Sequence, residues 1–273
     1  MSKPAKPSSL PTGNSGNKSA ARSGGKSAAP GKTSVVQKLT RKTAAKAPAK
    51  TANAGKAGRS SGLDRARTVE IFRRLAAQNP EPKGELEHVN AYTLLVAVVL
   101  SAQATDAGVN KATRALFKVA DTPQKMLALG EDQVRDYVKT IGLFRNKAKN
   151  VIALSQKLLA EHGGEVPADR DALTALPGVG RKTANVVLNM AFGQKTMAVD
   201  THVFRVANRL EMSAGKNPEV VETDLMRVVP DDFLLYAHHW LILHGRYTCL
   251  ARKPRCGVCV IAELCRSGDK VAE

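Results

Sequence analysis

A lysine and an aspartate, eighteen residues apart, are the side chains in this sequence best suited to joint chemistry. Lys182 follows the Gly-rich turn 177–180, and Asp200 stands just before an amphipathic segment. A helix N-terminus disfavours positive charge, so the Lys182 amine should lose its proton more readily than a free lysine and become nucleophilic. The same position favours an ionised Asp200. A simpler interpretation is equally compatible with the spacing: Lys182 would bind a phosphate, and Asp200 would cap the N-terminus of a helix.

The segments around the turn predict a helix–hairpin–helix. Apolar residues precede the turn in 173–176 and recur at helical spacing in 184–191. Gly178 and Gly180 allow backbone angles closed to other residues and let a ligand approach the main chain. Unpaired N–H groups at the start of the second helix suit a phosphate oxygen, so this turn is a candidate site for a phosphate backbone.

Helical periodicity continues through the chain from Leu63, and no segment sustains the period-2 alternation of a sheet. The fold class is therefore predicted to be all-α, with the apolar run Leu94–Leu100 in a buried helix. No stretch approaches the roughly 20 apolar residues of a membrane span. The expected helices cover residues near 69–76, then 92–101, 107–120, 123–129, 131–141, 146–162, the hairpin pair, 201–210, 218–229 and 233–247.

The basic charge is concentrated at the N-terminus. The 273 residues carry a formal net charge of +18, and residues 1–60 contain thirteen Lys or Arg and no acidic residue. Residues 1–61 also lack aromatic side chains, which predicts a disordered basic tail. Three interpretations of this tail remain open: an arm that holds the protein near DNA, a solvated tail without a role, or an organellar transit peptide.

Four cysteines crowd the C-terminus with the spacing C-x6-C-x2-C-x5-C. The sequence has no secretory signal, so such crowding favours a metal site over disulfides. Four thiolates suit either a zinc ion or a 4Fe–4S cluster. Arg252 and Lys253 lie between the first two cysteines and are expected to face a phosphate backbone. The four candidate ligands are Cys249, Cys256, Cys259 and Cys265.

Several of these motifs together resemble one family. LPGVGRKTANVVLN followed by VDTHV is similar to the bacterial endonuclease III family of DNA base-excision glycosylases, over about residues 63–266. In that family the hairpin lysine forms a covalent intermediate and the aspartate assists it, roles that fall on Lys182 and Asp200. The 6-2-5 cysteine spacing is similar to the family's cluster loop. The resemblance therefore implies a 4Fe–4S cluster held by the four cysteines.

The resemblance also implies a two-lobed helix–hairpin–helix glycosylase fold. Residues 84–194 would form a six-helix bundle that contains the hairpin. Residues 62–83 would join 195–273 in a second helical lobe that carries the iron–sulfur loop. Lys182 and Asp200 would then face each other across the boundary between the lobes, where binding pockets commonly form.

Two further segments resemble the elements with which the family fills the gap left by a base turned out of the duplex. Gln103 of LSAQATD would enter the vacated space, and Leu143 of IGLF would separate neighbouring bases. Without the resemblance, Gln103 is an ordinary helix-end residue and Leu143 a core leucine. The other implied DNA contacts are Gly178, Val179, Gly180, Arg181, His202, Arg252 and Lys253.

The resemblance predicts a base-excision repair glycosylase with AP lyase activity. Such an enzyme removes oxidised pyrimidines and cleaves abasic sites by β-elimination through a lysine Schiff base. We expect a monomer that acts on damaged double-stranded DNA, in the cytoplasm and with the nucleoid, and not at a membrane. The alternatives are an adenine-mismatch glycosylase, which usually lacks the lysine, and a non-catalytic helix–hairpin–helix DNA-binding protein. His238 and His239 lack the spacing of a metal pair, and we expect them to be satisfied polar residues or packing residues.

Overall fold

The computed structural model describes residues 62–271, with side chains from Arg65 onward. The predicted basic tail, residues 1–61, lies outside this range, so its role stays a prediction. Every regular element in the described range is helical, and none is long and apolar enough to span a membrane. The α-helices are α1 (Gly62–Gln78), α2 (Ala91–Leu100), α3 (Asp106–Val119), α4 (Pro123–Val138), α5 (Phe144–His162), α6 (Arg170–Thr174), α7 (Arg181–Phe192), α8 (Thr201–Arg209), α9 (Pro218–Val228) and α10 (Asp231–Tyr247).

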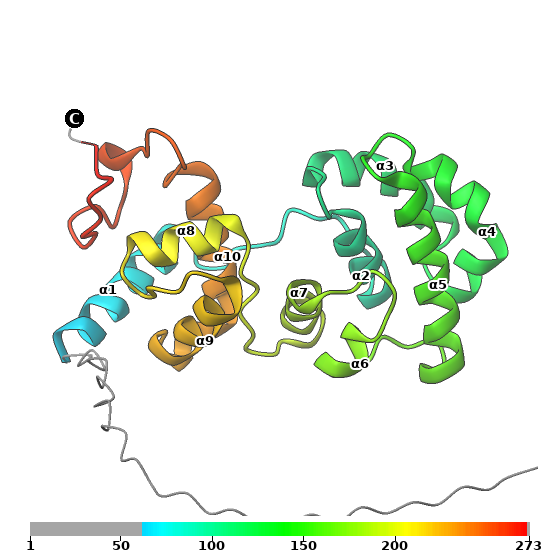
Figure 1. The fold of residues 1–273 in the computed structure, drawn as a ribbon, viewed down its shortest axis with the longest axis horizontal. Helices are drawn as coiled ribbons and strands as arrows, with labels where there is room; N and C mark the ends of the chain where they lie inside the picture. The colour runs from blue at the N-terminus through cyan, green and yellow to red at the C-terminus, as the bar shows by residue number, and fades with distance from the viewer. Residues whose placement is uncertain (1–61, 272–273) are drawn as a thin grey trace, which may run out of the picture. The chain divides into compact units, whose positions relative to one another are not determined.

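Helices α2 to α7 enclose one hydrophobic core, and we call them the first helix group (Figure 1). The apolar run Leu94–Leu100 in α2 is buried throughout, as predicted. Side chains of Asn90, Thr105 and Thr122 cap α2, α3 and α4, and each accepts a hydrogen bond from the backbone N–H group three residues after the cap. The predicted pair of helices at 123–129 and 131–141 forms α4, which is interrupted at Gly130 by a left-handed φ of 79°.

The second helix group consists of α1 and α8 to α10 around a separate core. Helix α1 lies beside α10, although they are the first and last α-helices of the described range (Figure 1). Its Phe72 ring stacks on Phe233 at 5.8 Å between centroids and also packs against Trp240. The Trp240 indole N–H donates to the carbonyl of Asn79 at 2.7 Å, which fixes the end of α1. On the basis of these two cores, we propose lobe boundaries near residues 84 and 194.

A small third cluster joins the groups at the point where the chain crosses between them. Leu94 and Val98 of α2 pack there with Val186 of α7 and with Ala198, which lies in the extended segment before α8. Because this contact involves α7 and the segment that leads to Asp200, it positions the two parts of the sequence that carry the predicted chemistry.

Candidate active site

The Gly-rich turn adopts a backbone that only glycine accommodates easily. Gly178 has a φ of 79°, and a Cβ added there would lie 2.9 Å from the Asn150 amide nitrogen. Gly180 is the N-cap of α7 and has no side chain with which to cap it. The first N–H groups of α7 therefore have no side-chain acceptor, which is the arrangement that binds an anionic oxygen. Val179 is buried and contributes to the first core.

Lys182 stands exposed in the first turn of α7. Asn185, three residues later, donates from its amide to the carbonyl of Met197 at 3.0 Å. The hydroxyl of Thr196 donates to the carbonyl of Asn185 at 2.6 Å. Residues i and i+3 share a helix face, so these bonds bring the Lys182 face and the Asp200 segment to one region.

Asp200 is the N-cap of α8, as the simpler interpretation holds. Its Oδ1 accepts hydrogen bonds from the backbone N–H groups of His202 and Val203, both at 2.8 Å. Its Oδ2 has no hydrogen-bond partner among the described residues. The carboxylate therefore combines a fixed position with one oxygen free to meet a substrate, so capping does not exclude a catalytic role.

His238 of α10 lies close enough to Lys182 for the two charges to interact, which the sequence did not reveal. Burial lowers the pKa of His238 to about 3, with the neighbouring charges of His239 and Lys182 acting in the same direction. The ring is thus neutral at pH 7 and bonds to the backbone of Ala198, two residues before Asp200. The histidines are buried as expected, but Nδ1 of each has no partner within the described part of the chain. The periodicity of α10 predicted only packing for this position.

A cavity lies where the loop after α2 meets the end of α10. Its wall includes Thr105, Asp106 and His202, together with Arg246 and Tyr247. The Arg246 guanidinium donates to Asp106 at 2.6 Å and also pairs with Glu85, so charged groups from both helix groups line the cavity. His202 belongs to this wall, whereas Lys182 and Asp200 do not. The structure thus brings His202 to the Gln103 loop and keeps Lys182 and Asp200 outside this cavity.

Three of the predicted DNA contacts have left-handed backbones, which are costly for residues with side chains. The φ angles are 54° at Gln103, 58° at Leu143 and 52° at Lys253. Leu143 is 55% exposed, so it is not the core leucine of the simpler interpretation. The loops of Gln103 and Leu143 adjoin, because a Cβ added to Gly142 would lie 3.8 Å from the Gln103 carbonyl oxygen. Strained, exposed side chains are typical of binding sites.

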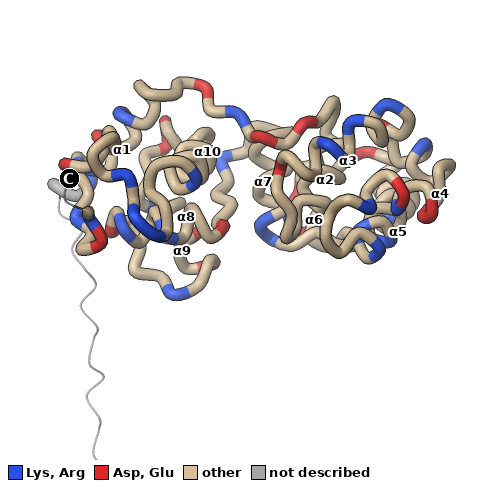
Figure 2. The backbone as a smooth tube through the Cα atoms, turned by 90° about the horizontal axis from the view of Figure 1, so that it is seen from above, with Lys and Arg blue, Asp and Glu red and all other residues tan. Residues whose placement is uncertain are grey.

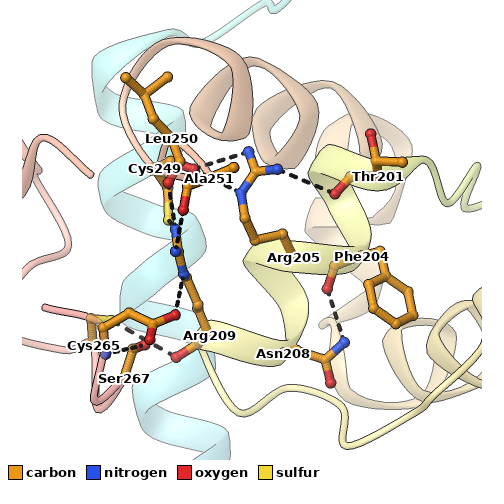
Figure 3. A network of polar contacts seen from close by, with 11 residues as sticks. Thr201, Phe204, Arg205, Asn208, Arg209, Cys249, Leu250, Ala251, Cys265 and Ser267 are labelled. Carbon is orange, nitrogen blue, oxygen red and sulfur yellow. Dashed lines mark hydrogen bonds and ion pairs between the residues drawn. The ribbon is translucent and has the colours of Figure 1, made fainter. Parts of the chain in front are cut away.

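Two arginines of α8 hold the first cysteine of the C-terminal loop (Figure 3). Arg205 donates to the carbonyl oxygen of Cys249 at 3.1 Å. It also donates to the carbonyl oxygen of Gly245 in α10 at 2.7 Å. Arg209 donates to the carbonyl of Leu250 at 2.6 Å and approaches Sγ of Cys249 at 3.4 Å. The position of the C-terminal loop therefore depends on α8, the helix that Asp200 caps.

The four cysteines fit an iron–sulfur cluster. All are free thiols, which argues against the disulfide alternative. They line one mainly apolar cavity, while no three Cys, His, Asp or Glu side chains of the described range meet as ligands of a single ion. Four cysteine sulfurs around a single cavity are a ligand set that can hold a 4Fe–4S cluster. Arg252 and Lys253 are exposed on the same loop.

Arg181 is not free to bind DNA in this structure. Its guanidinium forms two hydrogen bonds of 2.8 Å with Glu222 of α9, and this contact raises the arginine pKa further. The predicted DNA contact at Arg181 would require this ion pair to open. Figure 2 shows Lys and Arg positions on both helix groups, so other cations are available for a phosphate backbone.

Known proteins share both the fold and the cysteine loop. A profile of the HhH-GPD superfamily of base excision DNA repair proteins matches residues 96–231. A profile of the iron–sulfur binding domain of endonuclease III matches residues 249–265. Endonuclease III of Haemophilus influenzae and that of Escherichia coli K12 are each 58% identical over 209 residues, which is 77% of this chain and 99% of theirs. The chain belongs to the endonuclease III family.

A solved structure of an endonuclease III agrees with this assignment. The trapped covalent intermediate of that enzyme with DNA superposes with a TM-score of 0.70 at 44% identity, over 74% of this chain and 95% of the other. This endonuclease III-family protein is therefore a DNA-binding base-excision repair enzyme, a DNA glycosylase and AP lyase, with an iron–sulfur binding domain. The all-α helix–hairpin–helix prediction is confirmed, and the two alternative functions are not favoured.

Loss of one cysteine should remove the cluster and weaken the second helix group. We expect Cys256→Ser to lose its iron and its yellow-brown colour. A lost cross-link costs about 3 kcal/mol, which lowers the melting temperature of a domain of this size by about 10 °C. Iron assay, visible absorption and thermal melting measure these effects. Val258→Ala, an exposed position in the same loop, is the control. Full iron content in Cys256→Ser would contradict the ligand assignment.

Proposed function

We propose that this enzyme excises oxidised pyrimidines and cleaves abasic sites through a Schiff base on Lys182. The observation that supports this most strongly is the position of Lys182, exposed beside the uncapped turn and on the face bonded to the Asp200 segment. A related endonuclease III has been solved as a trapped covalent intermediate with DNA. A nucleophilic lysine would form such an intermediate.

In the first step, the neutral Lys182 amine attacks C1′ of the lesion nucleotide. The bond between C1′ and the base breaks, and the base leaves with its electron pair. The free oxygen of Asp200 stabilises the positive charge that develops on the sugar and assists the proton transfer from the amine. The hydrogen bonds at its other oxygen keep the carboxylate in place.

In the second step, the sugar ring opens and a protonated Schiff base links Lys182 to C1′. This group withdraws electrons and acidifies C2′. Loss of a C2′ proton then expels the 3′ phosphate, which breaks the strand by β-elimination. Water hydrolyses the Schiff base and restores the amine. Each bond change requires only Lys182, Asp200, DNA and water.

DNA would bind across the hairpin turn, the Gln103 and Leu143 loops and the cysteine loop. Gln103 would occupy the space left by the extruded nucleotide, and Leu143 would separate its neighbours. Their left-handed backbones and the exposure of Leu143 support these roles. The four cysteines would hold a 4Fe–4S cluster that fixes the loop carrying Arg252 and Lys253. We also propose that the enzyme is a monomer and associates with the nucleoid.

Duplexes that each contain one lesion test this function. The full chain should release thymine glycol and cut the strand 3′ to it, and borohydride should trap the protein on an abasic-site duplex. An adenine–guanine mismatch should remain uncut. Excision without any trapped adduct would indicate a hydrolytic enzyme and contradict the Schiff-base mechanism.

A further inference from the structure

A single carboxylate of the second helix group holds the start of both hairpin helices. Glu222, in the middle of α9, accepts two hydrogen bonds of 2.8 Å from Arg181, the first residue of α7. A nitrogen of Arg170, the first residue of α6, lies 3.9 Å from the same carboxylate. Both hairpin helices therefore begin at an arginine that approaches Glu222.

The burial of the Glu222 carboxylate requires a positively charged partner. Its side chain is 9% exposed, whereas that of Arg181 is 49% exposed. A buried carboxylate without a partner is strongly destabilising, so the folded protein needs at least one arginine at this position. The two parallel hydrogen bonds also fix the orientation of the Arg181 guanidinium.

The contact lies next to the proposed nucleophile and joins the two cores. Arg181 precedes Lys182 in the first turn of α7, which packs in the first core, while the neighbours of Glu222 on α9, Val221 and Leu225, pack in the second. The contact therefore couples the position of Glu222 to the first turn of α7, which carries Lys182. A displacement of about 1 Å at a reacting group can cost up to 10²-fold in rate.

We propose that Glu222 is a positioning residue, which through Arg181 fixes the first turn of α7 relative to the second helix group. The proposal rests on the proposed role of Lys182. It assigns to Arg181 a bond within the protein, in place of the DNA phosphate contact expected from the sequence. Arg181 therefore contributes to the rate of the covalent step and does not neutralise a DNA phosphate.

The test compares binding with chemistry in the full, cluster-containing protein. Glu222→Gln keeps the side-chain size but removes the charge that holds Arg181. The rate of borohydride trapping on a saturating abasic-site duplex should fall by about ten-fold or more. The dissociation constant for a duplex with a chemically reduced abasic site should stay within about two-fold. Asp232→Asn, which removes an exposed acid in the first turn of α10, controls for the loss of one charge and should trap at the wild-type rate.

Two further variants separate positioning from a general loss of structure. Glu222→Asp retains the charge and should recover part of the trapping rate, even if Glu222→Gln melts at a lower temperature. The double variant of Glu222→Gln with Arg181→Gln should trap no more slowly than either single variant, because both remove one contact.

The salt dependence of binding tests the assignment of Arg181. Arg181→Gln should leave the slope of log K against log salt unchanged. A slope reduced by about 0.9 would show that Arg181 neutralises a phosphate, and would overturn the proposal. Wild-type trapping rates in Glu222→Gln would overturn it as well. Absence of trapping by the wild-type protein would instead count against the Schiff-base mechanism itself.

Discussion

Replacement of Lys182 by glutamine should abolish the covalent adduct while DNA binding persists. Glutamine has a similar length but no nucleophilic amine, so no Schiff base can form. Removal of a group on which the chemistry depends typically costs about 10⁴-fold or more, and we expect trapping to fall at least about 10³-fold. The uncapped N–H groups of α7 remain in the variant, so affinity for a reduced abasic-site duplex should change by only a few-fold.

The control for this experiment is Lys118→Gln. Lys118 is an exposed lysine in the last turn of α3, and its replacement removes one positive charge from the same helix group. It should trap at the wild-type rate. If Lys182→Gln also traps at that rate, the nucleophile is another amine and the proposed mechanism is wrong.

Replacement of Asp200 should separate its two roles, because asparagine caps helices as well as aspartate does. In Asp200→Asn, Oδ1 can still accept from His202 and Val203, so the unfolding free energy should change by less than about 0.5 kcal/mol. The charge at the free oxygen is lost. We therefore expect single-turnover excision to slow by about 10²- to 10⁴-fold, the range of a positioned acid–base group.

Asp200→Ala should show the same kinetic loss together with about 1 kcal/mol of lost stability, since the cap is then absent. Asn217→Ala removes the N-cap of α9, whose side chain accepts from Val220 at 2.9 Å, and serves as the control for cap loss. It should lower stability by a similar amount and leave excision unchanged. Excision at the wild-type rate in Asp200→Asn would reduce Asp200 to a helix cap.

The features that the sequence determined by itself are local ones. The helical periodicity, the turn glycines and the cysteine spacing each extend over a few residues, and each gave the correct element. The two helices on either side of Gly130 were also recognised, because glycine interrupts a helix through its own backbone. The spacing alone is compatible with both catalytic and simpler roles for Lys182 and Asp200. The catalytic roles follow from the family resemblance.

The tertiary structure decided which distant residues act on these elements. Glu222 lies 41 residues from Arg181 and removes that arginine from the expected phosphate site. His238 bonds to the backbone of Ala198 and interacts electrostatically with Lys182, from a helix whose periodicity indicates only burial. Such partners belong to different helices, and their meeting depends on how two hydrophobic cores pack together. Apolar patterns along the sequence specify which face of a helix is buried, but charged pairs between faces arise only when the fold brings those faces together.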